Sequence, residues 1–168
     1  MSTVNGLPAH ILLNHFVVVL GSLTAILAIA CALWPAARRR LIWLVLALGV
    51  TTLVLTPLTA SSGEWLLRKV GPSSPVLDSH AALGQTLVYM VAALAAALAL
   101  LAAVHIRQAR GHAVKTAVHA AVSVLVVVAA VTVLVQTYRI GESGARAAWG
   151  NLASGPAAEL LRHGTTVE

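Results

Sequence analysis

Charged residues are scarce in this 168-residue chain, at 10%, whereas hydrophobic residues make up 59%. Soluble domains carry about 25% charged residues, so this composition is that of an integral membrane protein. The sequence has a single cysteine, which excludes an internal disulfide and a cluster of thiolate metal ligands. Aromatic residues are also few, at 4%. Alanine, glycine, serine and threonine are abundant instead, and such small side chains favour close packing of membrane helices.

Acidic residues number five against eleven lysines and arginines, which gives a net charge of +6. The basic residues are dispersed among apolar segments, so nucleic acid is not an expected partner. Anionic lipid headgroups fit this charge better. The first nine residues contain no lysine or arginine, and the apolar segment after them is too long for a signal-peptide core. We therefore expect a retained first membrane helix.

Four apolar segments each approach or exceed the about 20 residues that a helix needs to span a bilayer. They cover residues 10–34, 41–60, 79–105 and 114–138. The sequence therefore predicts an all-α fold, a four-transmembrane-helix bundle in a single integral membrane domain over residues 1–168, with a tail from residue 139. Between the second and third segments, residues 61–70 group Trp65 and other apolar side chains against charged ones, which predicts a short interfacial helix.

Charged residues are distributed unevenly over the connections. The first and third connections are basic and contain no acid: Arg38, Arg39, Arg40, Arg107, Arg110 and Lys115. All five acidic residues lie in the second connection or the tail: Glu64, Asp78, Glu142, Glu159 and Glu168. The positive-inside rule then places both basic connections in the cytoplasm. We expect a multi-pass protein of the bacterial inner (plasma) membrane with both termini external.

Polar residues within the four segments concentrate near the expected external ends. In a membrane helix such groups turn towards one another, because lipid offers them no partners. The sequence therefore predicts a polar pocket open to the outside. All four segments contribute to it: Asn14, His15, Thr56, Thr59, His80, Gln85, Tyr89, Thr132, Gln136, Thr137 and Tyr138.

His15 and His80 are the strongest candidates for chemistry in this pocket, with Glu64 on the adjoining connection and His10 at the rim. Three imidazoles and a carboxylate suit zinc, copper or non-haem iron. In a site for haem b, His15 and His80 would be axial ligands from two helices. His10 and His15 are separated by about 140° on an ideal helix, so they share a face only if the chain around His10 is not helical.

Structural interpretations of the same residues stay open, because histidines at helix ends often hydrogen-bond a carbonyl or water. His119, one turn before Ser123, fits an interhelical hydrogen bond better than a ligand site. Cys31 lies in the apolar run AIACALW, which indicates a packing position. No nucleotide-binding loop, zinc-protease motif or nucleophile elbow in its strand–turn–helix context occurs, so the sequence predicts no catalytic residue.

Four motifs together resemble one bacterial membrane family. They are GLPAHILLNHF in the first segment, PLTASSGEWLLRKV after the second, DSHAALGQTL opening the third and YRIGESGARAAWG in the tail. The family is catalogued as domain of unknown function 2231, and the chain is similar to its actinobacterial members. The resemblance implies a four-helix integral membrane domain without an established activity. Some relatives are fused to Rieske-type iron–sulfur domains, which implies redox or respiratory surroundings.

The resemblance also implies which positions carry a site. The histidine positions of the family fall on His10, His15 and His80, and its acidic position falls on Glu64. The family usually reads His-Phe-Pro in the first helix, whereas Phe16 is followed here by valine, so a kink beside His15 is missing. These 168 residues contain no Rieske domain, so we expect any electron partner to be a separate protein.

Two functions of different classes are consistent with the sequence. The first is a redox accessory protein that binds a transition metal or haem b through His15 and His80, with Glu64 and His10 as further ligands or as their partners. The second is a non-catalytic structural or assembly subunit of a larger membrane complex. A transporter fits less well, because the inner half of the bundle lacks a polar lining. The expected partners are the lipid bilayer and a respiratory or other membrane protein.

Overall fold

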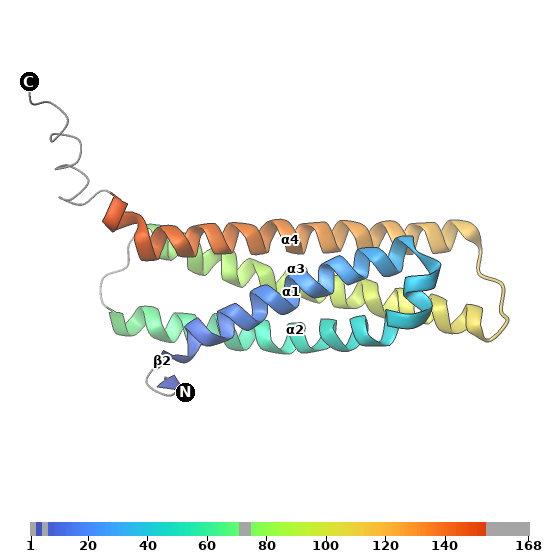
Figure 1. The fold of residues 1–168 in the computed structure, drawn as a ribbon, viewed down its shortest axis with the longest axis horizontal. Helices are drawn as coiled ribbons and strands as arrows, with labels where there is room; N and C mark the ends of the chain where they lie inside the picture. The colour runs from blue at the N-terminus through green and yellow to red at the C-terminus, as the bar shows by residue number, and fades with distance from the viewer. Residues whose placement is uncertain (1–2, 5–6, 71–74, 154–168) are drawn as a thin grey trace, which may run out of the picture.

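Four long helices lie side by side in the computed structural model (Figure 1). The structure describes residues 3–4, 7–70 and 75–153. The helices are α1 (Ala9–Leu33), α2 (Pro35–Val70), α3 (Pro75–Ala109) and α4 (Thr116–Ala153). Before α1, the short strands β1 (Thr3–Val4) and β2 (Leu7–Pro8) pair antiparallel, with Thr3 opposite Pro8.

The prediction of an all-α fold with four helices long and apolar enough to cross a membrane is confirmed. The apolar spans are Leu13–Leu33, Pro35–Trp65, Leu77–Ala109 and Thr116–Arg146. Helices of this length and composition imply a lipid bilayer as their environment.

The structure does not show the separate interfacial helix expected at residues 61–70, since these residues continue α2 to Val70. Ser61 and Ser62 interrupt the apolar run in sequence but not the helix. Their hydroxyls donate to the carbonyl oxygens of Leu58, at 3.0 Å, and of Thr59, at 2.8 Å, within the preceding turn. The helical backbone therefore continues where the composition changes.

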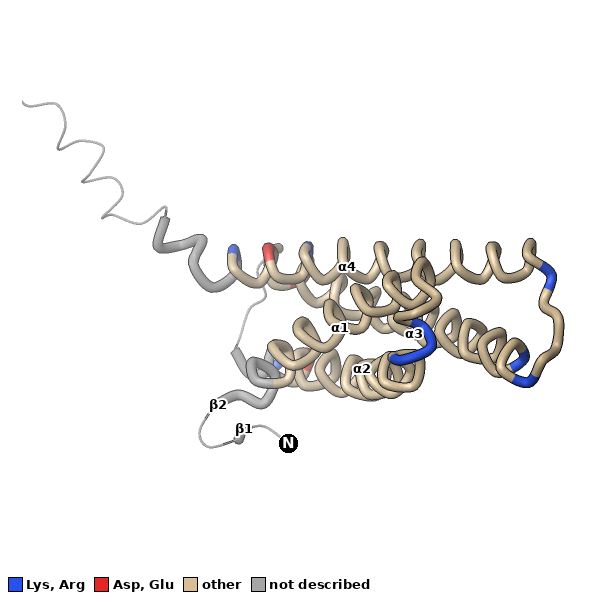
Figure 2. The backbone as a smooth tube through the Cα atoms, turned by 45° about the vertical axis from the view of Figure 1, so that its right-hand side comes forward, with Lys and Arg blue, Asp and Glu red and all other residues tan. Residues whose placement is uncertain are grey.

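The helices follow an up-down-up-down order in which α1 packs against α2 and α4, and α3 packs against the same two helices. α1 and α3 are therefore diagonal partners across the bundle. The α1–α2 turn and the α3–α4 connection lie towards one end (Figure 1). That end, which we call the basic end, carries Arg38, Arg39, Arg40, Arg107, Arg110 and Lys115 (Figure 2). We call the opposite end, where both acidic and basic residues lie, the mixed end.

The two connections at the basic end differ in length. Trp34 alone separates α1 from α2. Its N–H donates to the carbonyl oxygen of Ala30 at 2.8 Å, and its own carbonyl oxygen accepts from the N–H of Arg38 at 3.0 Å. Residues 110–115 join α3 to α4. Gly111 closes α3 with a φ of 76°, and the N–H of the next residue, His112, donates back to the carbonyl oxygen of Arg107 at 3.0 Å. This is the left-handed glycine cap that commonly ends helices.

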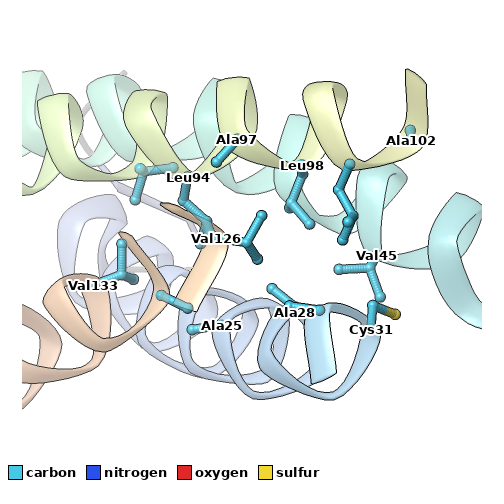
Figure 3. Close-up of a cluster of buried hydrophobic side chains, with 14 of the residues drawn as sticks. Ala25, Ala28, Cys31, Val45, Leu94, Ala97, Leu98, Ala102, Val126 and Val133 are labelled. Carbon is cyan, nitrogen blue, oxygen red and sulfur yellow. The ribbon is translucent and has the colours of Figure 1, made fainter. Parts of the chain in front are cut away.

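Buried aliphatic side chains fill the centre of the bundle (Figure 3). Leu94 and Leu98 of α3 are fully buried together with Val45 of α2 and Val126 of α4. α1 presents mainly small residues to them, such as Ala25 and Ala28. Leucines from one helix thus interdigitate with alanines from another, which lets the four helices pack closely.

Candidate functional site

The mixed end contains the polar residues that the sequence analysis assigned to a pocket. Four of them, from α2 and α4, are buried: Thr56, Thr59, Gln136 and Thr137. Five others are exposed on the outer surface: His15, Gln85, Tyr89, Thr132 and Tyr138. For these five the expectation of a buried side chain is wrong, although Gln85 still bonds a neighbouring helix through Glu64. Near a helix end, an exposed polar side chain can also reach headgroups or water.

His80 lies at the start of α3 and contacts α4. Its Nδ1 lies 2.9 Å from the hydroxyl of Ser143, and that hydroxyl also lies 3.0 Å from the carbonyl oxygen of Ile140. A serine has one hydroxyl proton, and the carbonyl can only accept it, so Nδ1–H of His80 is the donor to Ser143. Nε2 is then the ring nitrogen with the lone pair. Gly144 leaves room for the imidazole ring, because a Cβ at this position would lie 3.2 Å from Cε1 of His80.

Glu64 and Gln136 belong to two further contacts between helices at this end. Gln85 of α3 donates its amide to the carboxylate of Glu64 on α2 at 2.8 Å. Gln136 of α4 donates its amide to the backbone carbonyl oxygen of Leu83 on α3 at 2.9 Å. Together with the His80–Ser143 contact, these bonds link α3 to both of its neighbours. At the mixed end, polar side chains thus hold helices together.

The four predicted ligand residues occupy different surroundings. The side chain of His15 is exposed on α1, His80 is half-buried between α3 and α4, and Glu64 is half-buried on α2. His10 is part of helix α1, and its side chain lies outside the described part of the chain. Among the described residues, no three histidine, cysteine, aspartate or glutamate side chains come together in a way that could hold a metal ion.

A shallow depression of about 200 Å³ lies beside Ser143, lined by Leu83 and residues of α4. Glu142 and Arg146 line it and pair with each other at 2.5 Å. Pockets for organic ligands typically have volumes of about 300–1,000 Å³. This depression is therefore too small to enclose one.

The basic end contains a buried polar contact that the sequence analysis did not find. The side chain of Arg38 is only 6% exposed, and its Nη1 donates to Nε2 of His119 on α4. A guanidinium has no acceptor, so Nε2 of His119 must be unprotonated and the imidazole neutral. The interhelical hydrogen bond expected at His119 is confirmed, with Arg38 as its partner.

Helical spacing is the signal that could have located Arg38. The run of three arginines that Arg38 opens predicts a loop there, but α2 already begins at Pro35. From Arg38 onwards, one face of α2 is buried at intervals of three or four residues: Arg38, Ile42, Val45, Gly49, Thr52, Thr56 and Thr59. Extending that apolar stripe backwards places Arg38 in the core, whereas Arg39 and Arg40 are exposed.

Residues 6–153 match the family described as Predicted membrane protein (DUF2231), which confirms the resemblance seen in the sequence motifs. No curated protein and no solved structure matches the sequence.

Proposed function

The chain belongs to the DUF2231 family of predicted membrane proteins, and on that premise we propose that it is a non-catalytic structural or assembly subunit of a larger membrane complex. The observation that carries the proposal is the outward face of α3. We further propose that the protein resides in the bacterial inner membrane with both termini external. The basic end, which carries no acidic residue, supports this orientation through the positive-inside rule.

Small side chains dominate the face of α3 that points away from the bundle. Its exposed positions between residues 80 and 105 are Ala82, Gln85, Thr86, Tyr89, Ala93, Ala96, Ala99, Leu100 and Ala103. Their spacing follows the helix turn, so they form one continuous stripe, which we call the alanine face. A helix of another protein can approach closely along such a face, because small residues let the two backbones come together.

Bulky side chains make up most of the outward faces of the other helices, although α4 also exposes Ala117, Ala120 and Ala121. α1 exposes Phe16, Val19, Leu23 and Ile26; α2 exposes Trp43, Leu44, Val50, Val54 and Leu58; α4 exposes Val124, Leu125, Val128, Val131 and Val135. Flexible lipid tails pack equally well against such side chains. The alanine face differs from all three, and this difference supports a protein neighbour along α3.

Side-chain hydrogen bonds at the mixed end support a structural role as well. Each bond described there joins α3 to α2 or to α4. Each also involves a residue that was expected to bind a ligand or to line the polar pocket, namely His80, Glu64 or Gln136. Interhelical bonds of this kind stabilise a membrane bundle by roughly 0.6–1.7 kcal/mol each. They keep α3 fixed while its outer face binds a partner.

The size of the native complex tests this proposal. The full chain, tagged and expressed in its own organism, would be extracted in mild detergent and sized on a native gel. We expect a species larger than the monomer, and we expect Ala93→Leu with Ala96→Leu to shift the chain to the monomer position. The matched control adds similar bulk on α4 through Val128→Leu and Val131→Leu, and it should leave the complex intact. A monomeric parent, or equal behaviour of the two variants, would refute the proposal.

A metal- or haem-binding accessory protein with an electron-transfer role is the second candidate. The contact between His80 and Ser143 favours it, because histidines that ligate metals usually donate their other ring N–H to a protein group. His80 would be one ligand, with His15, Glu64 and His10 as the others, or with His15 as the second axial ligand of a haem b.

Metal analysis separates the two candidates. Iron, copper and zinc would be measured in the purified protein together with its visible spectrum. If the protein binds a metal through His80, the parent should contain close to one equivalent and His80→Ala should lose it. His112→Ala is the control and should keep the metal, because His112 is exposed at the basic end. Equal metal contents in all three proteins would exclude His80 as a ligand and leave the structural role.

A further inference from the structure

Arg38 is a cation inside a membrane bundle, and no carboxylate of the described residues forms a salt bridge with it. Within the described ranges the one salt bridge joins Arg146 and Glu142, at the other end of the molecule. The five cations that share the basic end with Arg38 add to its charge: Arg39, Arg40, Arg107, Arg110 and Lys115. A buried charge is costly unless an opposite charge or strong hydrogen bonds compensate it. The position of Arg38 therefore calls for an anion.

His119 positions the guanidinium and does not neutralise it. Because Nε2 accepts from Nη1 of Arg38, the imidazole contributes no charge of its own. The guanidinium has five N–H donors in a planar fork, and the described contacts occupy one nitrogen. The remaining donors suit the oxygens of a phosphate group, which a guanidinium binds with two parallel hydrogen bonds.

Ser123 provides a second, independent observation. Its hydroxyl oxygen is buried, and it has no hydrogen-bond partner among the described residues. Ser123 follows His119 by four residues on α4, so the two side chains lie on the same face of that helix. An unsatisfied hydroxyl one turn deeper than the Arg38–His119 contact adds a further donor for a bound anion.

Two exposed tryptophans near Arg38 support a position of this residue at the level of lipid phosphates. Trp34 and Trp43, on either side of it in the sequence, are exposed, and tryptophans at helix ends concentrate at the membrane–water interface. The α3–α4 connection extends beyond the α1–α2 turn (Figures 1 and 2). The start of α4, the helix that contributes His119, thus continues past the turn that precedes Arg38.

We propose that the Arg38–His119 contact is part of a binding site for a phosphate group, in which Arg38 is the main donor, His119 its positioning residue and Ser123 an additional donor. A phosphodiester of an anionic phospholipid and free inorganic phosphate both have the required chemistry. The proposal does not depend on the role of the alanine face or on a metal at the mixed end.

Lipid selectivity of the full chain tests the site. The protein would be reconstituted in nanodiscs, and its binding of phosphatidylglycerol would be compared with that of phosphatidylcholine by native mass spectrometry. We expect Arg38→Gln to reduce the preference for phosphatidylglycerol roughly tenfold, as the loss of one or two charged hydrogen bonds predicts. Arg39→Gln is the matched control, because it removes the same charge from an exposed neighbour. It should keep most of the preference.

A second experiment tests whether free inorganic phosphate binds. In nanodiscs of phosphatidylcholine alone, the unfolding temperature would be measured in phosphate and in chloride at equal ionic strength. Stabilisation by phosphate that is lost in Arg38→Gln identifies the free anion as a ligand, and selectivity for phosphatidylglycerol alone identifies the lipid. Equal losses in Arg38→Gln and Arg39→Gln, or no effect of Arg38→Gln in either arm, would overturn the proposal.

Two further variants keep the test decisive if Arg38→Gln fails to fold. Arg38→Lys keeps the charge and loses the planar fork, so it should lose most of the selectivity, and unchanged selectivity would overturn the proposal. His119→Gln offers an amide oxygen in place of Nε2, and it should retain the selectivity that His119→Leu loses. Equal selectivity of these two variants would contradict the role given to His119.

Discussion

Gln136 on α4 donates its side-chain amide to the backbone carbonyl oxygen of Leu83 on α3, across 2.9 Å. Leu83 lies within the continuous helix α3, so its carbonyl oxygen accepts this bond in addition to its place in the helix. Gln136 is buried, at 3% exposure, and an amide at such a position in a membrane needs a partner inside the protein. The contact therefore fixes the distance and rotation between α3 and α4.

Replacing Gln136 with leucine should weaken the bundle only moderately. The side-chain volume is kept and the Leu83 carbonyl stays within its helix, so we expect a loss of about 0.6–1.7 kcal/mol in the free energy of unfolding. Unfolding of the purified protein in mixed micelles of rising denaturing-detergent content measures this. Thr132→Val, at an exposed position whose hydroxyl bonds only its own helix, is the control and should change stability little. A loss above about 3 kcal/mol would show that Gln136 holds more than this one contact.

Gly49 and Gly84 predict opposite effects of the same substitution. A Cβ at Gly49 would lie 3.0 Å from Cδ1 of Leu98, which is fully buried, whereas a Cβ at Gly84 would meet nothing within 4 Å. Gly49→Ala should therefore destabilise the protein by roughly 1 kcal/mol, since overpacking outweighs the gain in helix propensity. Gly84→Ala should be neutral or stabilising by up to about 1 kcal/mol. Thermal unfolding of the two variants side by side decides this, and equal shifts would contradict the close approach of α2 to α3.

The Arg38–His119 contact predicts an asymmetric response to two substitutions. His119→Leu leaves the buried guanidinium without its described partner and should cost roughly 1.5–3 kcal/mol of stability. His119→Gln restores an acceptor and should cost less than half of that. His112→Leu, on the exposed connection between α3 and α4, is the control for removing a histidine. Equal losses in all three variants would show that the hydrogen bond contributes no stability.

Cysteine labelling tests the proposed orientation. The native Cys31 is fully buried, so it gives little background with a membrane-impermeant maleimide. Ser79→Cys places an exposed thiol at the mixed end, and it should react in intact cells. His112→Cys places one at the basic end, and it should react only after the membrane is permeabilised. The reverse pattern would place both termini in the cytoplasm.

The lengths of the apolar segments and the scarcity of charge within them predicted the four helices. A segment of this length has few alternatives, because it must cover about 30 Å of hydrocarbon. The rotation of each helix was harder to predict. α1 is apolar on almost all sides, so its sequence does not reveal that Val17, Thr24 and Ala28 face the core while His15 is exposed. Which polar side chains meet depends on this rotation, and the pairing of His80 with Ser143 follows from it.

The boundaries of α2 show a second limit. Ser61 and Ser62 looked like a break and are helical, while Arg38 looked like part of a loop and is buried in the bundle. In both cases the amino-acid composition suggests a helix boundary, but the hydrogen-bonded helical backbone continues through it. The spacing of buried residues along α2 is a better guide than the positions of its charges.

The single residue between α1 and α2 joins these helices more tightly than the connection between α3 and α4 joins its own pair. Trp34 leaves the first hairpin no slack, so α1 and α2 can neither slide along each other nor rotate independently. The hairpin of α3 and α4 is joined by the longer connection of residues 110–115, which contains the glycine cap at Gly111. A rearrangement of the chain at the basic end therefore has room only between α3 and α4, because the α1–α2 turn has no residue to spare.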